Sequence, residues 1–222
     1  MQTQSCVNSL LFCMQAIFPS TPSGTYFFAY CTQRGVFFIV AKLGGMLYNN
    51  DMKIQIIGYS GSGKSTLARK LGEIANIPVL HLDSTHFYGD WQERDAEEQA
   101  AIVREFMANN DSWVIDGNYT SVATERFALT DMTIFMDFNR VFCFFSAYRR
   151  AKKYRGKVRP DLGMAEKFDR SFRRWILFDG RTKERKQKHL DNLNATSGHK
   201  VVLKNRRQVR KFVEQFAKTY GK

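Results

Sequence analysis

Five short apolar runs alternate with helical patterns along residues 52–222. The first, "KIQII" at 53–57, alternates and is rich in β-branched residues, which is typical of a β-strand. Four later runs share this character: "IPVLHLD", "SWVIDGNY", "MTIFMDFNR" and "HKVVLKN". Helical spacing is found at 66–75, 95–109, 120–129 and 206–220. Because strand and helix segments alternate, the pattern predicts an α/β domain with a parallel sheet and right-handed crossovers.

Residues 1–51 follow a different pattern. They are poor in charge, rich in Phe and Cys, and have no clear period. "SLLFCMQAIF" has the length of a signal peptide, but no Lys or Arg precedes it, and "GVFFIVA" is too short to span a bilayer. A membrane anchor is the alternative interpretation. We expect instead a non-native or disordered extension, with translation beginning at Met52 or, less favoured, Met46, and we predict no function for it.

The stretch "GYSGSGKS" follows the first predicted strand and opens a helix. It fits the pattern G-x-x-x-x-G-K-[ST], and this strand–loop–helix setting is what a phosphate-binding loop requires. Glycines let main-chain N–H groups approach phosphates, the helix adds its positive end, and the lysine reaches the outer phosphates. The serine at the end of the pattern is the expected Mg²⁺ ligand. We therefore expect ATP to be held by Gly58, Gly61, Ser62, Gly63, Lys64, Ser65 and Thr66, and Mg²⁺ by Ser65.

Aspartates stand at the ends of three predicted strands, on the side of the sheet where ligands bind in such folds. Asp116, after "WVI", is the candidate second Mg²⁺ ligand. Asp83 is the candidate that faces the acceptor, because a carboxylate can take the proton of an attacking hydroxyl. Asp137 is the third. Each of them has a plainer interpretation as an aspartate that caps a loop.

Charge is distributed unevenly along the chain. The net charge is +13, but residues 52–138 carry 7 Lys and Arg against 13 Asp and Glu, whereas residues 139–222 carry 25 against 7. This asymmetry indicates that the first half supplies carboxylates and the second half binds phosphates. The alternative is that the basic residues only form a solvated surface. The four cysteines show no paired or metal-like spacing, which favours a reduced, cytoplasmic protein.

Arginines are concentrated between Tyr148 and Lys186. Gly156 and Pro160 interrupt the helical pattern there, so we expect two helices and a loop that form a lid over about 149–181. Arginines that close over a phosphoryl group stabilise its charge during transfer. The catalytic candidates in this lid are Arg150, Arg155 and Arg159. Nucleic-acid binding through this basic, aromatic-containing segment is the competing interpretation.

Aromatic residues follow the second predicted strand. Phe87, Tyr88 and Trp91 could enclose a planar base or ring, or could equally be packing beneath a lid. His81 and His86 are too isolated to be metal ligands.

From Met52 onward the chain resembles the topology modulation (FlaR-like) proteins, which are related to adenylate kinase. The resemblance is carried by "GYSGSGKSTLARKLG", "HLDSTHFYGDW", "WVIDGNY", "FMDFNR", "RRAKKYRGKVRPD" and "FDRSFRRWILF". It implies a P-loop kinase fold with strand order 2-3-1-4-5, ATP and Mg²⁺. Adenylate kinases have Phe-Pro-Arg where Asn118-Tyr119 stands here, which argues against AMP as the acceptor. "HLDSTHFY" is similar to a region of uridine-kinase-like enzymes, which favours a hydroxyl acceptor.

Together these features predict one kinase domain over 52–222, which transfers a phosphoryl group from Mg–ATP to a small nucleoside- or nucleotide-like acceptor. Lys64, Asp83, Arg150, Arg155 and Arg159 are the expected catalytic residues. Two alternatives stay open: an ATP-regulated nucleic-acid-binding protein that affects DNA topology, and an NTPase without a small acceptor. No membrane partner is expected.

Overall fold

The computed structural model describes residues 26–32, 35–41, 52–88, 91–119, 121–159 and 161–221. The chain divides into two compact units, Met1–Asn49 and Asn50–Lys222. In the first, β1 (Tyr26–Thr32) and β2 (Gly35–Ala41) form an antiparallel pair. The rest of 1–51 lies outside the described residues, so the expectation of a non-native or disordered extension stays a prediction.

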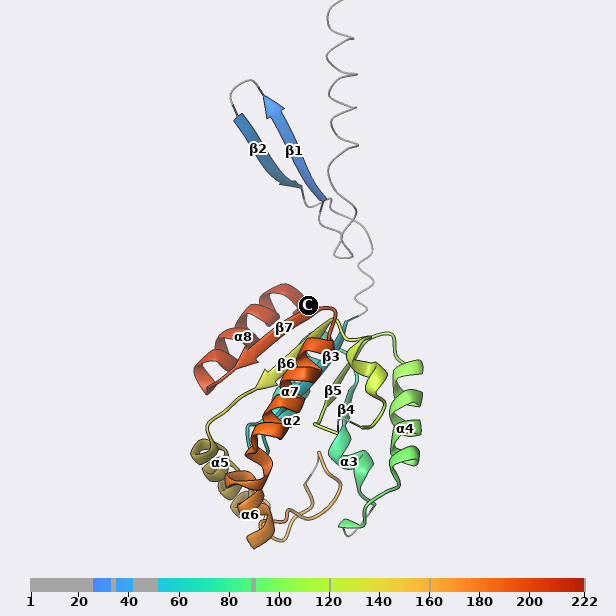
Figure 1. Cartoon of the computed structure of the whole chain (residues 1–222), viewed down its shortest axis with the longest axis vertical. Coiled ribbons are helices and arrows are strands. Elements are labelled where there is room, and N and C mark those ends of the chain that lie inside the picture. Colours follow the sequence, from blue (N-terminus) through green and yellow to red (C-terminus); the bar gives the residue numbers. More distant parts are fainter. Residues whose placement is uncertain are drawn as a thin grey trace, which may run out of the picture. The chain divides into compact units, whose positions relative to one another are not determined.

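The second unit is built on a five-stranded parallel sheet (Figure 1). Its strands are β3 (Lys53–Gly58), β4 (Val79–His81), β5 (Trp113–Asp116), β6 (Met132–Met136) and β7 (His199–Leu203). Their order across the sheet is β4-β5-β3-β6-β7, and every neighbouring pair is parallel. When these five strands are numbered 1 to 5 in chain order, with β3 as the first, their order across the sheet is 2-3-1-4-5. The predicted α/β fold class is therefore confirmed.

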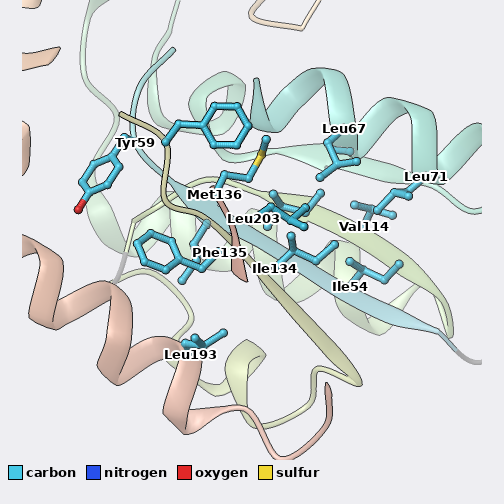
Figure 2. Close-up of a cluster of buried hydrophobic side chains, with 14 of the residues drawn as sticks. Ile54, Tyr59, Leu67, Leu71, Val114, Ile134, Phe135, Met136, Leu193 and Leu203 are labelled. Carbon is cyan, nitrogen blue, oxygen red and sulfur yellow. The ribbon is translucent and has the colours of Figure 1, made fainter. Parts of the chain in front are cut away.

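Helices cover both faces of this sheet. They are α2 (Lys64–Ala75), α3 (Leu82–His86), α4 (Ala96–Ala108), α5 (Arg140–Lys153), α6 (Arg170–Leu177), α7 (Lys183–Ala195) and α8 (Arg206–Tyr220), with short 3₁₀ turns η2 (Thr124–Phe127) and η3 (Asp179–Arg181). Figure 2 shows Leu67 and Leu71 of α2 on one side of the sheet and Leu193 of α7 on the other. The three central strands β3, β5 and β6 are buried almost throughout, as expected for a parallel sheet that is covered on both faces, whereas β4 is half-buried and the edge strand β7 is mostly exposed.

Five of the longer helices begin with a side-chain cap. The cap residues Asp95, Asn139, Asp169, Thr182 and Asn205 each accept a hydrogen bond from a main-chain N–H in the first turn of α4, α5, α6, α7 and α8. Helix α2 differs, because its cap is Gly63, which offers no side chain. The N–H groups at the start of α2 are therefore left for another acceptor.

Two local predictions need correction. The helix expected at 120–129 is only the 3₁₀ turn η2, because the chain there wraps around the buried Arg126. Asp83 does not end a strand: β4 stops at His81, and Asp83 lies in the first turn of α3. None of the helices in the described ranges is long and apolar enough to cross a bilayer.

Candidate active site

The glycine-rich loop between β3 and α2 is fixed by close main-chain contacts. Gly58 has a φ of 143° and Gly61 a φ of 81°, which disfavour other residues. A Cβ atom at Gly58 would lie 2.6 Å from the carbonyl oxygen of Met136, and one at Gly61 would lie 2.3 Å from that of Cys143. These two glycines are thus required by the neighbouring β6 and α5, and not only by the approach of a phosphate.

The loop opens into a cavity of about 950 Å³. Gly61, Gly63, Lys64, Ser65 and Thr66 all line it, and the uncapped start of α2 faces it. The Ser62 hydroxyl is buried without a partner in the described part of the chain. Exposed N–H groups at a helix N-terminus form an anion site, so this cradle fits a chain of phosphates.

Lys64 supplies the ammonium group of the cradle. Its Nζ donates to the Tyr59 carbonyl oxygen at 3.3 Å, and no carboxylate of the described residues forms an ion pair with it. Burial lowers the pKa of Lys64, while the charges of Asp83 and Asp116 partly offset that effect. The lysine is therefore held in the loop with its charge available to an anion.

Asp116 joins the end of β5 to the loop. The Ser65 hydroxyl donates to its Oδ2 at 2.8 Å, and its Oδ1 contacts His81 Nδ1. Burial opposes the charge on His81, but the hydrogen bond to Asp116 outweighs it and raises the pKa of His81. The hydroxyl and carboxylate oxygens fit Mg²⁺, which keeps most of its ligands as water and phosphate. Among the described residues there is no cluster of three His, Cys, Asp or Glu side chains that could hold a metal alone.

The contact of His81 with Asp116 was not predicted from the sequence. In the sheet, β4 and β5 pair so that His81 lies directly opposite Asp116. The signal is therefore the strand register, which the sequence alone does not provide.

Asp83 lines the same cavity and accepts a hydrogen bond from the Tyr119 hydroxyl at 3.1 Å. Burial, followed by the charge of Asp83, raises the pKa of Tyr119, so Tyr119 stays a donor. The glycine-rich loop and Asp83 thus line one cavity. Asp137 does not line it; this residue is an ion-pair partner of Lys186 at 3.9 Å.

A buried arginine holds the segment that carries Tyr119. Arg126 is fully buried, and it donates to Gln55 Oε1 at 3.1 Å and to the Tyr119 carbonyl oxygen at 2.7 Å. It also donates to the carbonyl oxygens of Val122 and Ala123. Burial lowers the pKa of Arg126 to about 10, which leaves it charged at neutral pH. Arg126 therefore positions the segment after β5 without touching the cavity.

Aromatic rings form one wall beside Asp83. His86 packs against Phe87 and Tyr119, with ring centroids 4.6 and 4.5 Å apart, and Phe87 packs edge-on against Trp91 at 5.1 Å. All four rings line the cavity. Tyr88 does not, because it pairs with Glu98 and Arg94 outside it. We call His86, Phe87, Trp91 and Tyr119 the ring wall.

Of the three arginines predicted to act from a lid, Arg150 and Arg159 line the cavity. Arg159 forms a bidentate pair with Asp161 at 2.9 and 2.8 Å and a third bond to Glu166 at 3.1 Å. Arg150 pairs with the same Glu166 through Nε and Nη2, both at 2.9 Å. Arg155 is exposed and does not line the cavity, so its catalytic role stays only a prediction.

The two carboxylates that bind these arginines were not predicted from the sequence to belong to the site. Asp161 and Glu166 have side chains only 15% and 2% exposed. Burial opposes the charge of Arg159, but Asp161 and Glu166 outweigh it and raise the pKa of Arg159. Arg206 was also missed: its guanidinium lies about 3.6 Å from where a Cβ atom of Gly63 would be.

No protein-family model matches the chain, and no curated protein matches it. Among solved structures, an uncharacterized protein from Eubacterium ventriosum is similar at 16% identity, over 77% of this chain and 98% of that one, with a TM-score of 0.44. The shikimate kinase from Bacteroides thetaiotaomicron is similar at 17% identity, over 76% and 97%, with a TM-score of 0.46. The resemblance to topology modulation proteins is not confirmed by these comparisons and stays a prediction.

Proposed function

We propose that the unit Asn50–Lys222 transfers the terminal phosphoryl group of Mg–ATP to a hydroxyl group of a small nucleoside- or nucleotide-like acceptor. One observation carries this proposal. The uncapped start of α2, the Lys64 ammonium group and the acceptor-side Asp83 line a single cavity. Phosphoryl transfer to a hydroxyl needs hydrogen-bond donors that hold the phosphates of ATP and a base that accepts the proton of the attacking hydroxyl.

The phosphate half is assigned to main-chain N–H groups of residues 61–66 and to Lys64. In this assignment, Ser65 and Asp116 hold Mg²⁺, which would neutralise charge on the phosphates. The Ser65–Asp116 hydrogen bond supports it, because both oxygens already lie at one point beside the helix start.

The acceptor half is assigned to Asp83. The acceptor oxygen attacks the γ-phosphorus, its proton passes to the Asp83 carboxylate, and the bond to the β-phosphate oxygen breaks so that ADP leaves with the electron pair. The Tyr119 hydroxyl, bonded to Asp83 at 3.1 Å, holds this carboxylate in place. Guanidinium groups of Arg150 and Arg159 stabilise the moving phosphoryl group; Arg155 is a weaker candidate because it is exposed.

The test is transfer of labelled γ-phosphate from ATP by the full chain to a panel of nucleosides, nucleotides and small alcohols. We expect one acceptor class to be labelled and Lys64→Ala to lower the rate at least a hundredfold. Lys70→Ala, an exposed change on the same helix, is the matched control. Transfer that survives Lys64→Ala would contradict the assignment.

The second candidate is an ATP-regulated nucleic-acid-binding protein, favoured by the 25 Lys and Arg against 7 Asp and Glu in residues 139–222. Such binding should weaken by about one log unit in K per log unit of salt for each phosphate contacted. Bare hydrolysis of ATP without labelled acceptor would instead support an NTPase. The cytoplasmic location also remains a proposal, based on the cysteine pattern and the need for ATP.

A further inference from the structure

The cavity carries more positive charge than a bound triphosphate requires. The described residues that line it include ten Lys or Arg and four Asp or Glu, a formal charge of +6. Magnesium cancels part of the charge of a triphosphate, so Mg–ATP alone leaves much of this positive charge without a counter-charge. Six of the ten cations form no ion pair with a carboxylate of the described residues: Arg69, Arg149, Lys153, Arg185, Lys188 and Arg206.

Some of these unpaired cations lie beside the glycine-rich loop. The Arg206 guanidinium is about 3.6 Å from where a Cβ atom of Gly63 would be. Lys188 precedes His189, whose ring packs against the ring of Tyr59 in the loop, with centroids 5.4 Å apart. Arg206 and Lys188 are therefore placed to add to the binding of the triphosphate.

Helix α5 leads from the same loop to the ring wall. Its first turn contacts the loop at Gly61. Further along the helix, Arg150 binds Glu166 at 2.9 Å, and the Nζ of the next residue, Lys167, lies 5.8 Å from the Trp91 ring. The C-terminal half of α5 is thus connected by direct contacts to the segment that lies against the ring wall.

One face of α5 lines the cavity between these two points. It presents Ser146, Arg149, Arg150 and Lys153, which follow the i, i+3, i+4, i+7 spacing of a single helix face. Arg149 and Lys153 come six and ten residues after Cys143, which is about 9 and 15 Å along the helix from the contact with the loop. We call Arg149 and Lys153 the α5 pair.

The α5 pair has the geometry of a phosphate site. Residues four apart have Cβ atoms about 5–6 Å from each other, so the two cationic groups can meet on one anion. Without an anion, like charges at this spacing destabilise a helix. The arginine can donate two N–H bonds to a phosphate, and the lysine adds a point charge. Both side chains are exposed, so a ligand that enters the cavity can reach them.

From this arrangement we infer that the acceptor is a nucleotide, whose own phosphate binds the α5 pair. Its base packs on the ring wall and its hydroxyl faces Asp83. The phosphate held by the α5 pair takes no part in the transfer; it fixes the position of the acceptor. The inference rests on the proposed function and selects the nucleotide over the nucleoside among the acceptors that this function allows.

The test is calorimetry of the full chain with Mg²⁺ and the β,γ-imido analogue of ATP, which fills the triphosphate site. Guanosine, cytidine, uridine and thymidine are then titrated, each beside its 5′- and its 3′-monophosphate. We expect at least one monophosphate to bind at least tenfold more tightly than its nucleoside, and the better isomer shows where the acceptor carries its phosphate. Equal or tighter binding of every nucleoside overturns the inference, as does binding of neither class when the analogue binds. Failure of the analogue to bind overturns the proposed function, and the inference with it.

Variants test the role of the α5 pair. The double change Arg149→Gln and Lys153→Gln should weaken binding of the preferred monophosphate at least tenfold, and leave binding of its nucleoside and of the ATP analogue unchanged. Lys152→Gln with Lys157→Gln is the matched control, because it removes the same charge at exposed positions outside the cavity. An equal loss in both double variants would mean that only the overall charge matters, and an equal loss for nucleoside and monophosphate that the pair does not bind the phosphate. Weaker binding of the analogue would instead assign the pair to the triphosphate; each of these results contradicts the inference.

Discussion

Asn118 and Gly58 are joined by two hydrogen bonds. Asn118 Oδ1 accepts from the Gly58 N–H at 2.9 Å, and Asn118 Nδ2 donates to the Gly58 carbonyl oxygen at 2.7 Å. The side chain thereby extends the pairing of β5 with β3 beyond the end of the strand. Because Tyr119 follows and donates a hydrogen bond to Asp83, these two bonds link the glycine-rich loop to Asp83.

Asn118→Ala should lower the free energy of unfolding by about 1–3 kcal/mol, because it leaves two partly buried main-chain groups of Gly58 without partners. The measurement is urea unfolding at neutral pH. Asn194→Ala, an exposed change in α7, serves for comparison and should have little effect. Equal stability of the two variants would show that the two Asn118–Gly58 hydrogen bonds do not stabilise the fold.

Gly61→Ala should destabilise the fold strongly and abolish nucleotide binding. The new Cβ would lie 2.3 Å from the Cys143 carbonyl oxygen, at a φ of 81°. Gly156→Ala is matched in backbone conformation, with a φ of 68°, but its Cβ would meet nothing within 4 Å. It should cost only about 1 kcal/mol. Thermal melting of both variants checks the difference, and similar losses would mean that the close contact is unimportant.

Arg126→Met should lower the free energy of unfolding by about 2–4 kcal/mol, since Gln55 and the carbonyl oxygens after β5 lose a buried donor. It should also weaken acceptor binding, because Tyr119 is no longer held. Denaturant unfolding and acceptor titration provide the two readouts. Arg104→Met, at an exposed arginine paired with Glu125, is the control. A stable Arg126→Met with normal acceptor affinity would refute the positioning role.

His189 makes stability depend on pH. Burial, followed by the charge of Lys64, lowers the pKa of His189 to about 4, and its Nδ1 has no partner among the described residues. Between pH 6.5 and 4 the unfolded chain binds a proton there that the folded chain does not. Stability due to this residue is therefore complete above pH 6.5 and falls by about 2–3 kcal/mol toward pH 4.

His189→Phe should remove that loss, because Phe keeps the contacts with Tyr59 and Phe135 and cannot be protonated. Unfolding curves at several pH values would show a flatter profile than the wild type. His199→Gln changes an exposed histidine and should follow the wild-type profile. A His189→Phe profile as steep as the wild type would argue against the buried neutral imidazole.

Asp116→Asn should raise the Mg²⁺ concentration needed for half-maximal turnover at least tenfold, because a neutral amide is a poorer ligand for a hard cation. Asp137→Asn is a matched change directly after β6, two strands from β5 in the sheet and outside the cavity. It should leave the Mg²⁺ dependence unchanged. The same shift in both variants would remove Asp116 from the metal site.

The place of the glycine-rich loop between a strand and a helix, and the strands of the sheet, could be predicted because their signals are local. The pattern from Gly58 to Ser65 carries its own conformation, and the apolar runs mark the strands. Contacts that depend on register or on tertiary packing could not be predicted. His81 meets Asp116 only through the pairing of β4 with β5. Arg126 and Glu166 look like surface charges in the sequence, and only the fold places them in buried hydrogen-bond networks.

The most direct measurement is isothermal titration calorimetry of Mg–ATP against the full chain, with Mg–AMP as the comparison. We predict saturable heat and a raised Tm with ATP. AMP should bind much more weakly, because it lacks the outer phosphates that the N–H groups at the start of α2 and the Lys64 ammonium group are proposed to bind. Neither heat nor thermal protection with ATP would contradict the assignment of this cavity to a triphosphate.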